Sequence, residues 1–98
     1  MRTKPIRVGN VAGVQLSLNV LNTVPWRDWI EVEVLDARTQ RAIPGYGRED
    51  DRIMAASAAH RVKWRDRQTL KDVGVPEICL AFHFYGEGWL YSFTFAEA

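Results

Sequence analysis

Tryptophan side chains beside charged residues are the part of this sequence whose types and spacing could do chemistry. The set comprises Trp26, Arg27, Asp28, Trp29, Glu87 and Trp89. A flat indole ring stacks on a sugar ring or an aromatic partner, while neighbouring charged groups form hydrogen bonds with a ligand. The set predicts a shallow ligand-binding platform at one end of the fold. The plainer interpretation is that these tryptophans close the open ends of a small sandwich.

Residues for catalysis or metal binding form no recognised pattern. His60 and His83 could join Cys79 or a carboxylate as metal ligands, but they lack ligand spacing on a shared turn. The acidic run Glu49-Asp50-Asp51 matches no calcium-loop pattern. The sequence contains no Ser-containing elbow and no Gly-rich phosphate loop. We therefore expect a chain without enzyme activity, metal or other cofactor.

Basic residues alternate with other residues along one segment, namely Arg61, Lys63, Arg65 and Arg67. On a strand they would share one face, and such a row could follow the phosphates of a single-stranded nucleic acid. The interpretation we favour is a solvated sheet face balanced by Glu31 and Glu33 across the sheet. A net charge of +1 supplies no overall field that attracts nucleic acid or an anionic membrane.

Alternating apolar and polar residues predict the strands that must position these side chains. The expected strands are Val14 to Val20, Trp29 to Leu35, Ala59 to Arg65, Ile78 to Tyr85 and Trp89 to Phe95. The first two are predicted to pair antiparallel, and the turn Gly86-Glu87-Gly88 is predicted to be a tight hairpin. The stretch from Arg48 to Ala59 has no clear pattern and is interpreted as a loop.

The predicted core is centred on the strand from Ile78 to Tyr85, which is apolar or aromatic on both faces and should therefore be central. Its expected members are Ile78, Leu80, Phe82, Phe84 and Trp64. In the last strand, one face is expected to carry Tyr91, Phe93 and Phe95, and the other Leu90, Ser92 and Thr94. Cys79 is predicted to be a buried thiol.

Length and composition restrict the class of protein. The 98 residues, 47% of them hydrophobic, suit one folded module covering residues 1–98. Without a segment of clear helical period, the class is all-β, a small antiparallel β-sandwich of jelly-roll or Ig-like type with about 6–8 strands. No apolar stretch is long enough to span a bilayer, and no signal peptide is visible. Localisation stays open, extracellular or cell-envelope if a secreted parent carries the module.

Several short motifs follow one another in a familiar order. They are Val32-Glu33-Val34-Leu35-Asp36, Ile43-Pro44-Gly45-Tyr46, His60-Arg61-Val62-Lys63-Trp64 and Leu90-Tyr91-Ser92-Phe93-Thr94-Phe95. From Ile6 to Phe95 the chain resembles the small C-terminal β-sandwich module of large bacterial glycoside-hydrolase-like and sialidase-like (BNR-type) proteins. The resemblance implies a β-sandwich and brings no catalytic residue with it. The chain departs from the family at Gly47 to Asp51, which lacks the usual Gly-Asp pair, and at Trp64-Arg65-Asp66, where the family has Trp-Lys-Gly.

The function predicted from the sequence is that of a non-catalytic accessory module. It would bind a neutral glycan weakly through the tryptophan set, or pack against a neighbouring glycosidase-like domain. The alternative is a freestanding structural or interaction protein that self-associates through an exposed sheet. A third class is a single-stranded nucleic-acid binder that uses the row from Arg61 to Arg67. No membrane partner is expected, and the ligand and the oligomeric state stay open.

Overall fold

The computed structural model of the chain describes residues 1–11, 13–22, 24, 27–54, 56–65 and 67–97. These residues form seven strands and one short helix. In chain order the elements are β1 (Ile6–Arg7), α1 (Val8–Val11), β2 (Val14–Leu21), β3 (Trp29–Asp36), β4 (Arg52–Ile53), β5 (Ser57–Arg61), β6 (Glu77–Tyr85) and β7 (Trp89–Glu97). Among these residues, no helix has the length and apolar character needed to cross a membrane.

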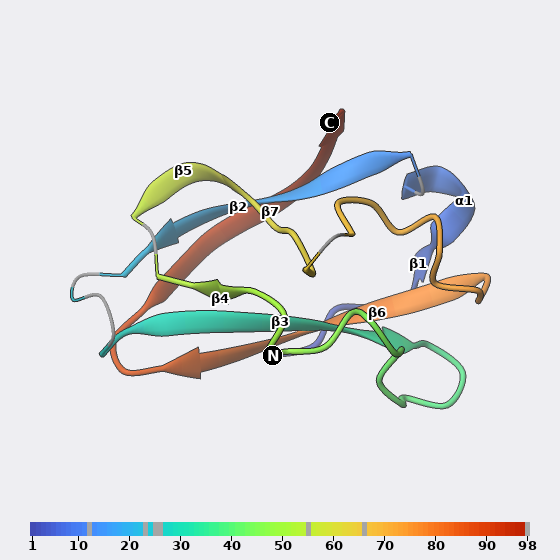
Figure 1. Ribbon diagram of the computed structural model, residues 1–98, viewed down its shortest axis with the longest axis horizontal. Helices are drawn as coiled ribbons and strands as arrows, with labels where there is room; N and C mark the ends of the chain where they lie inside the picture. The colour runs from blue at the N-terminus through green and yellow to red at the C-terminus, as the bar shows by residue number, and fades with distance from the viewer. Residues whose placement is uncertain (12, 23, 25–26, 55, 66, 98) are drawn as a thin grey trace.

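Two antiparallel sheets pack face to face (Figure 1). One sheet has the strand order β1-β6-β3-β4 and the other has the order β5-β2-β7. The strand β6 lies between β1 and β3, as its two-sided apolar pattern predicts. The expected all-β class and small antiparallel sandwich are therefore confirmed.

The core lies between the two sheets and is built from the alternating apolar residues of β2, β3 and β6. The side chains concerned are Leu16, Leu18, Val20, Ile30, Val32, Val34, Ile78, Leu80 and Phe82, all buried. Trp64 is also fully buried, and its indole Nε1 donates a hydrogen bond to the Val32 carbonyl oxygen at 2.9 Å. The Trp64 ring meets the Tyr46 ring edge-on at a centroid distance of 5.3 Å. The predicted core is thus confirmed at Ile78, Leu80, Phe82 and Trp64, and Cys79 is buried as expected.

Phe84 is the exception in the predicted core, because 43% of it is exposed. It has the inward parity of Phe82 but stands near the end of β6, two residues before Gly86. At this end of the strand the facing sheet does not cover it, so the prediction that Phe84 is buried is wrong.

The strands joined by the two short connections, β2 with β3 and β6 with β7, do not pair with each other, and this corrects both pairings predicted above. The strand β2 pairs with β7 from Val14↔Glu97 to Leu21↔Trp89, and β3 pairs with β6 from Trp29↔Tyr85 to Asp36↔Ile78. The connections from β2 to β3 and from β6 to β7 therefore cross between sheets instead of forming hairpins. The physical reason is that alternation decides which face of a strand is buried but does not select the neighbouring strand.

An irregularity in β7 reverses the predicted alternation at its start. Leu90 pairs with Val20 and Ser92 pairs with Asn19, so Tyr91 is an extra residue in the ladder. Such a bulge changes the face on which the preceding residues lie. Leu90 consequently packs against the core on the same side as Phe93 and Phe95, and Tyr91 is 62% exposed.

The segment after Tyr46 also differs from its prediction. The stretch expected to be a loop contains β4 and most of β5, although residue 55 lies outside the described residues. The strand expected to reach Arg65 ends at Arg61, and Trp64 then forms an isolated bridge with Arg67 around a tight turn. Arg65 has a positive φ of 55° in this turn, which breaks the extended conformation.

The central position of Phe82 generates a stability prediction. Phe82→Ala removes a side chain that is 1% exposed and that meets Phe93 of the opposite sheet at a centroid distance of 5.5 Å. We expect a loss of about 3–5 kcal/mol in the free energy of unfolding, from lost burial and the cavity left behind. Urea denaturation followed by circular dichroism measures this loss. An unchanged midpoint would contradict the placement of β6 in the core.

Tyr46 generates a prediction on alkaline stability. Burial raises the pKa of its phenol above the ordinary value of about 10. Between the two pKa values the unfolded chain has released this proton and the folded chain still holds it. The free energy of unfolding therefore has its full value below about pH 10 and falls as the pH rises through the folded pKa. Tyr46→Phe should cost about 1 kcal/mol at neutral pH, because the hydrogen bond from its hydroxyl to the Thr69 carbonyl oxygen (2.8 Å) is lost. Its unfolding free energy should then fall less steeply in alkali than that of the wild type; an equally steep fall would contradict the assignment.

Candidate functional site

The end of β2, the start of β3 and the turn after β6 lie at the same end of the sandwich, on the left in Figure 1. The fully buried carboxylate of Asp28 joins them. Its Oδ2 accepts a hydrogen bond from the Val24 amide at 3.1 Å, and its Oδ1 accepts one from the Glu87 amide at 3.0 Å. One carboxylate thus holds the backbone of both connections.

Gly86 shows how closely the two connections approach. Its φ is +72°, a conformation that glycine adopts without steric cost. A Cβ at this position would lie 2.6 Å from the Arg27 carbonyl oxygen and would also overlap Oδ1 of Asp28. The turn after β6 can therefore sit against Asp28 only because residue 86 lacks a side chain.

Arg27 and Glu87 place opposite charges at the surface of this end. The Arg27 guanidinium donates from Nε and Nη2 to the Asp28 carboxylate at 2.9 and 3.0 Å. These hydrogen bonds, together with the charge of Asp28, raise the pKa of Arg27. Arg27 Nη2 also lies 3.4 Å from Glu87 Oε2, and the Glu87 side chain is 79% exposed. The exposed surface at this end therefore offers hydrogen-bond donors on Arg27 and hydrogen-bond acceptors on Glu87.

Trp89 is an exposed aromatic ring at this end. It is 61% exposed and lines a shallow hollow together with Glu87 and Gly88. Tyr91 and Phe84 are exposed large side chains close by in the sequence. The sequence analysis did not include these two, because it placed Phe84 in the core and Tyr91 on one strand face with Phe93 and Phe95. The position of Phe84 near the end of β6 and the bulge at Tyr91 account for their exposure.

Trp29 of the predicted set has a different environment. Its ring stacks on Tyr85 at a centroid distance of 4.8 Å, and its Nε1 donates to Glu31 Oε2 at 3.1 Å. The guanidinium of Arg52 lies 5.7 Å from the centre of the ring. Trp29 is thus packed against side chains on the outer face of its sheet. Trp26 lies outside the described residues.

Glu31 is the second buried carboxylate, which corrects the expectation that it lies on a solvated face. It is 3% exposed, because Arg48 Nε at 3.1 Å and Arg52 Nε at 3.4 Å cover it. Arg48 also donates to the Tyr85 hydroxyl, and the hydrogen bond with Glu31 raises the pKa of Arg48. The structure therefore builds a charged and aromatic cluster here whose members bind one another.

The row of basic residues does not form. Arg61 ends β5 and donates to Gln15 at 3.2 Å, whereas Arg65 lies in the tight turn and pairs with Asp50. Arg67 lies beyond that turn, 5.7 Å from the centre of the Tyr46 ring. The expected balance by Glu31 and Glu33 is also wrong, because both lie in the other sheet.

Each of the two histidines lies beside a carboxylate and is partly exposed. His60 Nε2 lies 3.3 Å from Asp51 Oδ2, and His83 Nε2 lies 2.8 Å from Glu33 Oε1. Within the described part of the chain, no group of three or more His, Cys, Asp or Glu side chains is placed to hold a metal ion. Asp50 and Asp51 of the acidic run hold the Gly47 and Lys63 amides, respectively.

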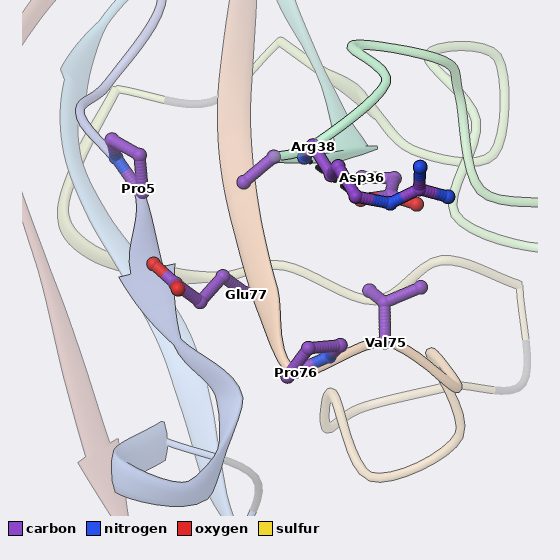
Figure 2. Close-up of a pocket in the computed structure, with 7 residues that line it drawn as sticks. Pro5, Asp36, Arg38, Val75, Pro76 and Glu77 are labelled. Carbon is purple, nitrogen blue, oxygen red and sulfur yellow. Dashed lines mark hydrogen bonds between the residues drawn. The ribbon is translucent and has the colours of Figure 1, made fainter.

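A second hollow, of about 460 Å³, lies at the opposite end of the sheet (Figure 2). Figure 2 shows Pro5 and Glu77 on one side and Asp36 and Arg38 on the other. Its lining residues are Pro5, Asp36, Ala37, Arg38, Val75, Pro76 and Glu77. The hollow has no aromatic ring, and Asp36 Oδ1 already accepts a hydrogen bond from the Arg38 amide at 2.9 Å. This hollow therefore offers a ligand no ring for stacking, in contrast to the Trp89 end.

Comparison with known proteins finds no family model that matches the chain, no significantly similar curated protein and no significantly similar solved structure.

The role of Asp28 generates a prediction on stability. Asp28→Ala leaves the amides of Val24 and Glu87 without their carboxylate acceptor, which we expect to cost about 2–4 kcal/mol in the free energy of unfolding. Glu87→Gln is the matched control, because the pair with Arg27 that it weakens is exposed and contributes little to stability. Urea denaturation of both variants measures the difference. Equal, small losses in the two variants would show that Asp28 does not hold the crossovers together.

Proposed function

We propose that the chain is a non-catalytic β-sandwich module that binds a neutral polysaccharide weakly through Trp89 and the polar side chains beside it. The observation that carries the proposal is the 61% exposure of Trp89 at the edge of a hollow lined by Glu87 and Gly88. An indole left in water forgoes the free energy of burial, and a ligand that covers the ring recovers part of it. The apolar face of a sugar ring is a partner of matching shape and character.

The rigidity of the turn supports the proposal. Trp89 follows a turn whose backbone is held by the buried carboxylate of Asp28, through the Glu87 amide. A surface that is already ordered loses little conformational entropy when a ligand binds. The hydrogen bonds of Asp28 thus keep the ring in place without occupying its exposed face.

The charges of the surface favour a neutral ligand over a polyanion. Arg27 and Glu87 have opposite signs and lie 3.4 Å apart, so together they present no net charge. A guanidinium donates hydrogen bonds and a carboxylate accepts them, and sugar hydroxyls do both. The hollow is shallow, so most hydroxyls of a bound sugar would remain in water, and the affinity is expected to be weak.

The role of such a module is to assist a catalytic neighbour. The order of the sequence motifs, which resembles that of modules in glycosidase-like proteins, supports this part of the proposal. A module with this role would hold a polymer near the neighbour and would take no part in bond cleavage. Packing against the neighbour would be a second contribution of the same module.

Fluorescence titration against a panel of soluble neutral and acidic polysaccharides tests the proposal. We expect the emission to change with at least one neutral polymer, because Trp89 becomes covered by sugar. Trp89→Ala should abolish this response and the binding, whereas Trp89→Phe, which keeps an aromatic face, should retain binding within about tenfold. Isothermal calorimetry provides a readout that does not depend on the fluorophore.

The matched control is Trp29→Phe. Trp29 stacks on Tyr85 and lies outside the proposed surface, so this change removes an indole without altering the Trp89 end. Binding by Trp29→Phe should equal that of the wild type. The proposal would be overturned if the wild type binds none of the polysaccharides, or if Trp89→Ala binds as well as the wild type does.

A further inference from the structure

The outer edge of β7 is the longest strand edge left open among the described residues. One edge of β7 pairs with β2 over the whole length of the strand, and no other strand of the described residues pairs with it. The remaining outer strands are short: β1 and β4 have two residues each, and β5 has five. The strand β7 has nine residues.

The sequence of β7 has few of the features that protect an edge from pairing. Proteins protect such edges with proline, with lysine and other charges, or with very short strands. From Trp89 to Ala96 the strand has no proline, no glycine and no charged residue, and its one bulge is confined to Tyr91 near the start. The segment from Ser92 to Glu97 is a regular strand, and Phe93, Thr94 and Phe95 at its centre are of types that favour extended backbone.

We propose that this edge pairs with the same edge of a second copy of the chain, in an antiparallel dimer with two-fold symmetry. When two identical strands pair antiparallel about a two-fold axis, the side chains on one face of the first strand lie opposite the side chains on the same face of the second. With Thr94 at the centre, Phe93 stands opposite Phe95 of the second copy, and Thr94 stands opposite its own counterpart. Aromatic residues that pair across strands stabilise a sheet.

Burial and charge favour a second copy as the partner. Phe93 and Phe95 pack against the core but are only partly buried, so a neighbouring strand would cover their open sides. The one charged residue of β7, Glu97, stands at its end, and in this register the two Glu97 positions lie about 20 Å apart. That distance is about two and a half times the screening length at physiological salt, so repulsion between the two charges is largely screened. The dimer would contain one continuous sheet with the strand order β5-β2-β7-β7-β2-β5.

The proposal is independent of sugar binding, because it depends on the backbone edge around Thr94 and not on the exposed ring of Trp89. Sedimentation velocity of the full chain over a wide concentration range tests it, and we expect a reversible change from monomer to dimer. Thr94 is exposed, so Thr94→Lys and Thr94→Glu should leave the fold intact. Each variant places two like charges opposite each other at the centre of the interface, and the dimer dissociation constant should rise at least about tenfold.

A mixture of the two variants provides the decisive comparison. Thr94→Lys and Thr94→Glu in equal amounts should form a heterodimer, because the opposed charges then attract. Ala58→Lys is the matched control, because it places the same charge on β5 at the other edge of the same sheet, and it should dimerise like the wild type. Hydrogen exchange of the wild type should show protection that increases with protein concentration at those amides between Ser92 and Ala96 that point away from β2.

Three results would overturn the proposal. They are a wild type that stays monomeric throughout the concentration range, a Thr94→Lys variant that dimerises as the wild type does, and a mixture that stays monomeric although both variants are folded. Circular dichroism establishes the folding of each variant. Should a variant fail to fold, the exchange measurement on the wild type decides alone, and protection that does not change with concentration would overturn the proposal.

Discussion

A carboxylate with no access to water stands at the point where the chain passes twice from one sheet to the other. A buried charge is tolerated only when surrounding donors replace the hydration that it has lost. Asp28 meets this requirement with the amides of Val24 and Glu87 and with the guanidinium of Arg27. Because these donors come from both crossover connections, the same hydrogen bonds that satisfy the charge also fix the two connections against each other.

The arrangement of the strands depends on those two crossovers. If each connection were a hairpin, β2 would pair with β3 and β6 would pair with β7. Instead β2 pairs with β7 and β3 with β6, so each ladder joins segments that are far apart in the sequence. This topology makes β7 an outer strand and starts it directly after the turn that Asp28 holds. The exposure of Trp89 and the open edge of β7 are two consequences of the same crossover.

The sequence predicts the faces of the strands well and their neighbours poorly. The alternation in β2, β3 and β6 identifies the inward residues, and Trp64 is recognised as a core residue, because burial follows a local period of two. The pairing of β2 with β7 cannot be predicted in this way, since it depends on contacts between distant segments. The bulge at Tyr91 is equally invisible, because it exists only in relation to the register of β2.

In the candidate site, too, local pattern predicts some features and contacts between distant segments decide the others. Turn chemistry and residue type draw attention to Arg27, Glu87 and Trp89, which lie at one end of the molecule. The predicted set also includes Asp28, which the sequence presents as a charged residue beside Arg27 and therefore as a surface residue. Its burial arises because the turn at Gly86 closes over it, and Gly86 is distant in the sequence. Local pattern therefore finds the neighbourhood of the site but does not separate the side chain that supports the surface from those that form it.

Mapping a neutral oligosaccharide onto the protein by nuclear magnetic resonance tests the central claim most directly. In a titration of the labelled chain, our account predicts that the largest chemical-shift changes occur at the indole of Trp89 and at the amides of Arg27, Glu87 and Gly88. The signals of Asp36, Arg38 and Glu77, which surround the hollow at the opposite end, should stay unchanged. Shifts confined to that opposite hollow, or no shifts with any oligosaccharide whose polymer was in the panel, would contradict the account.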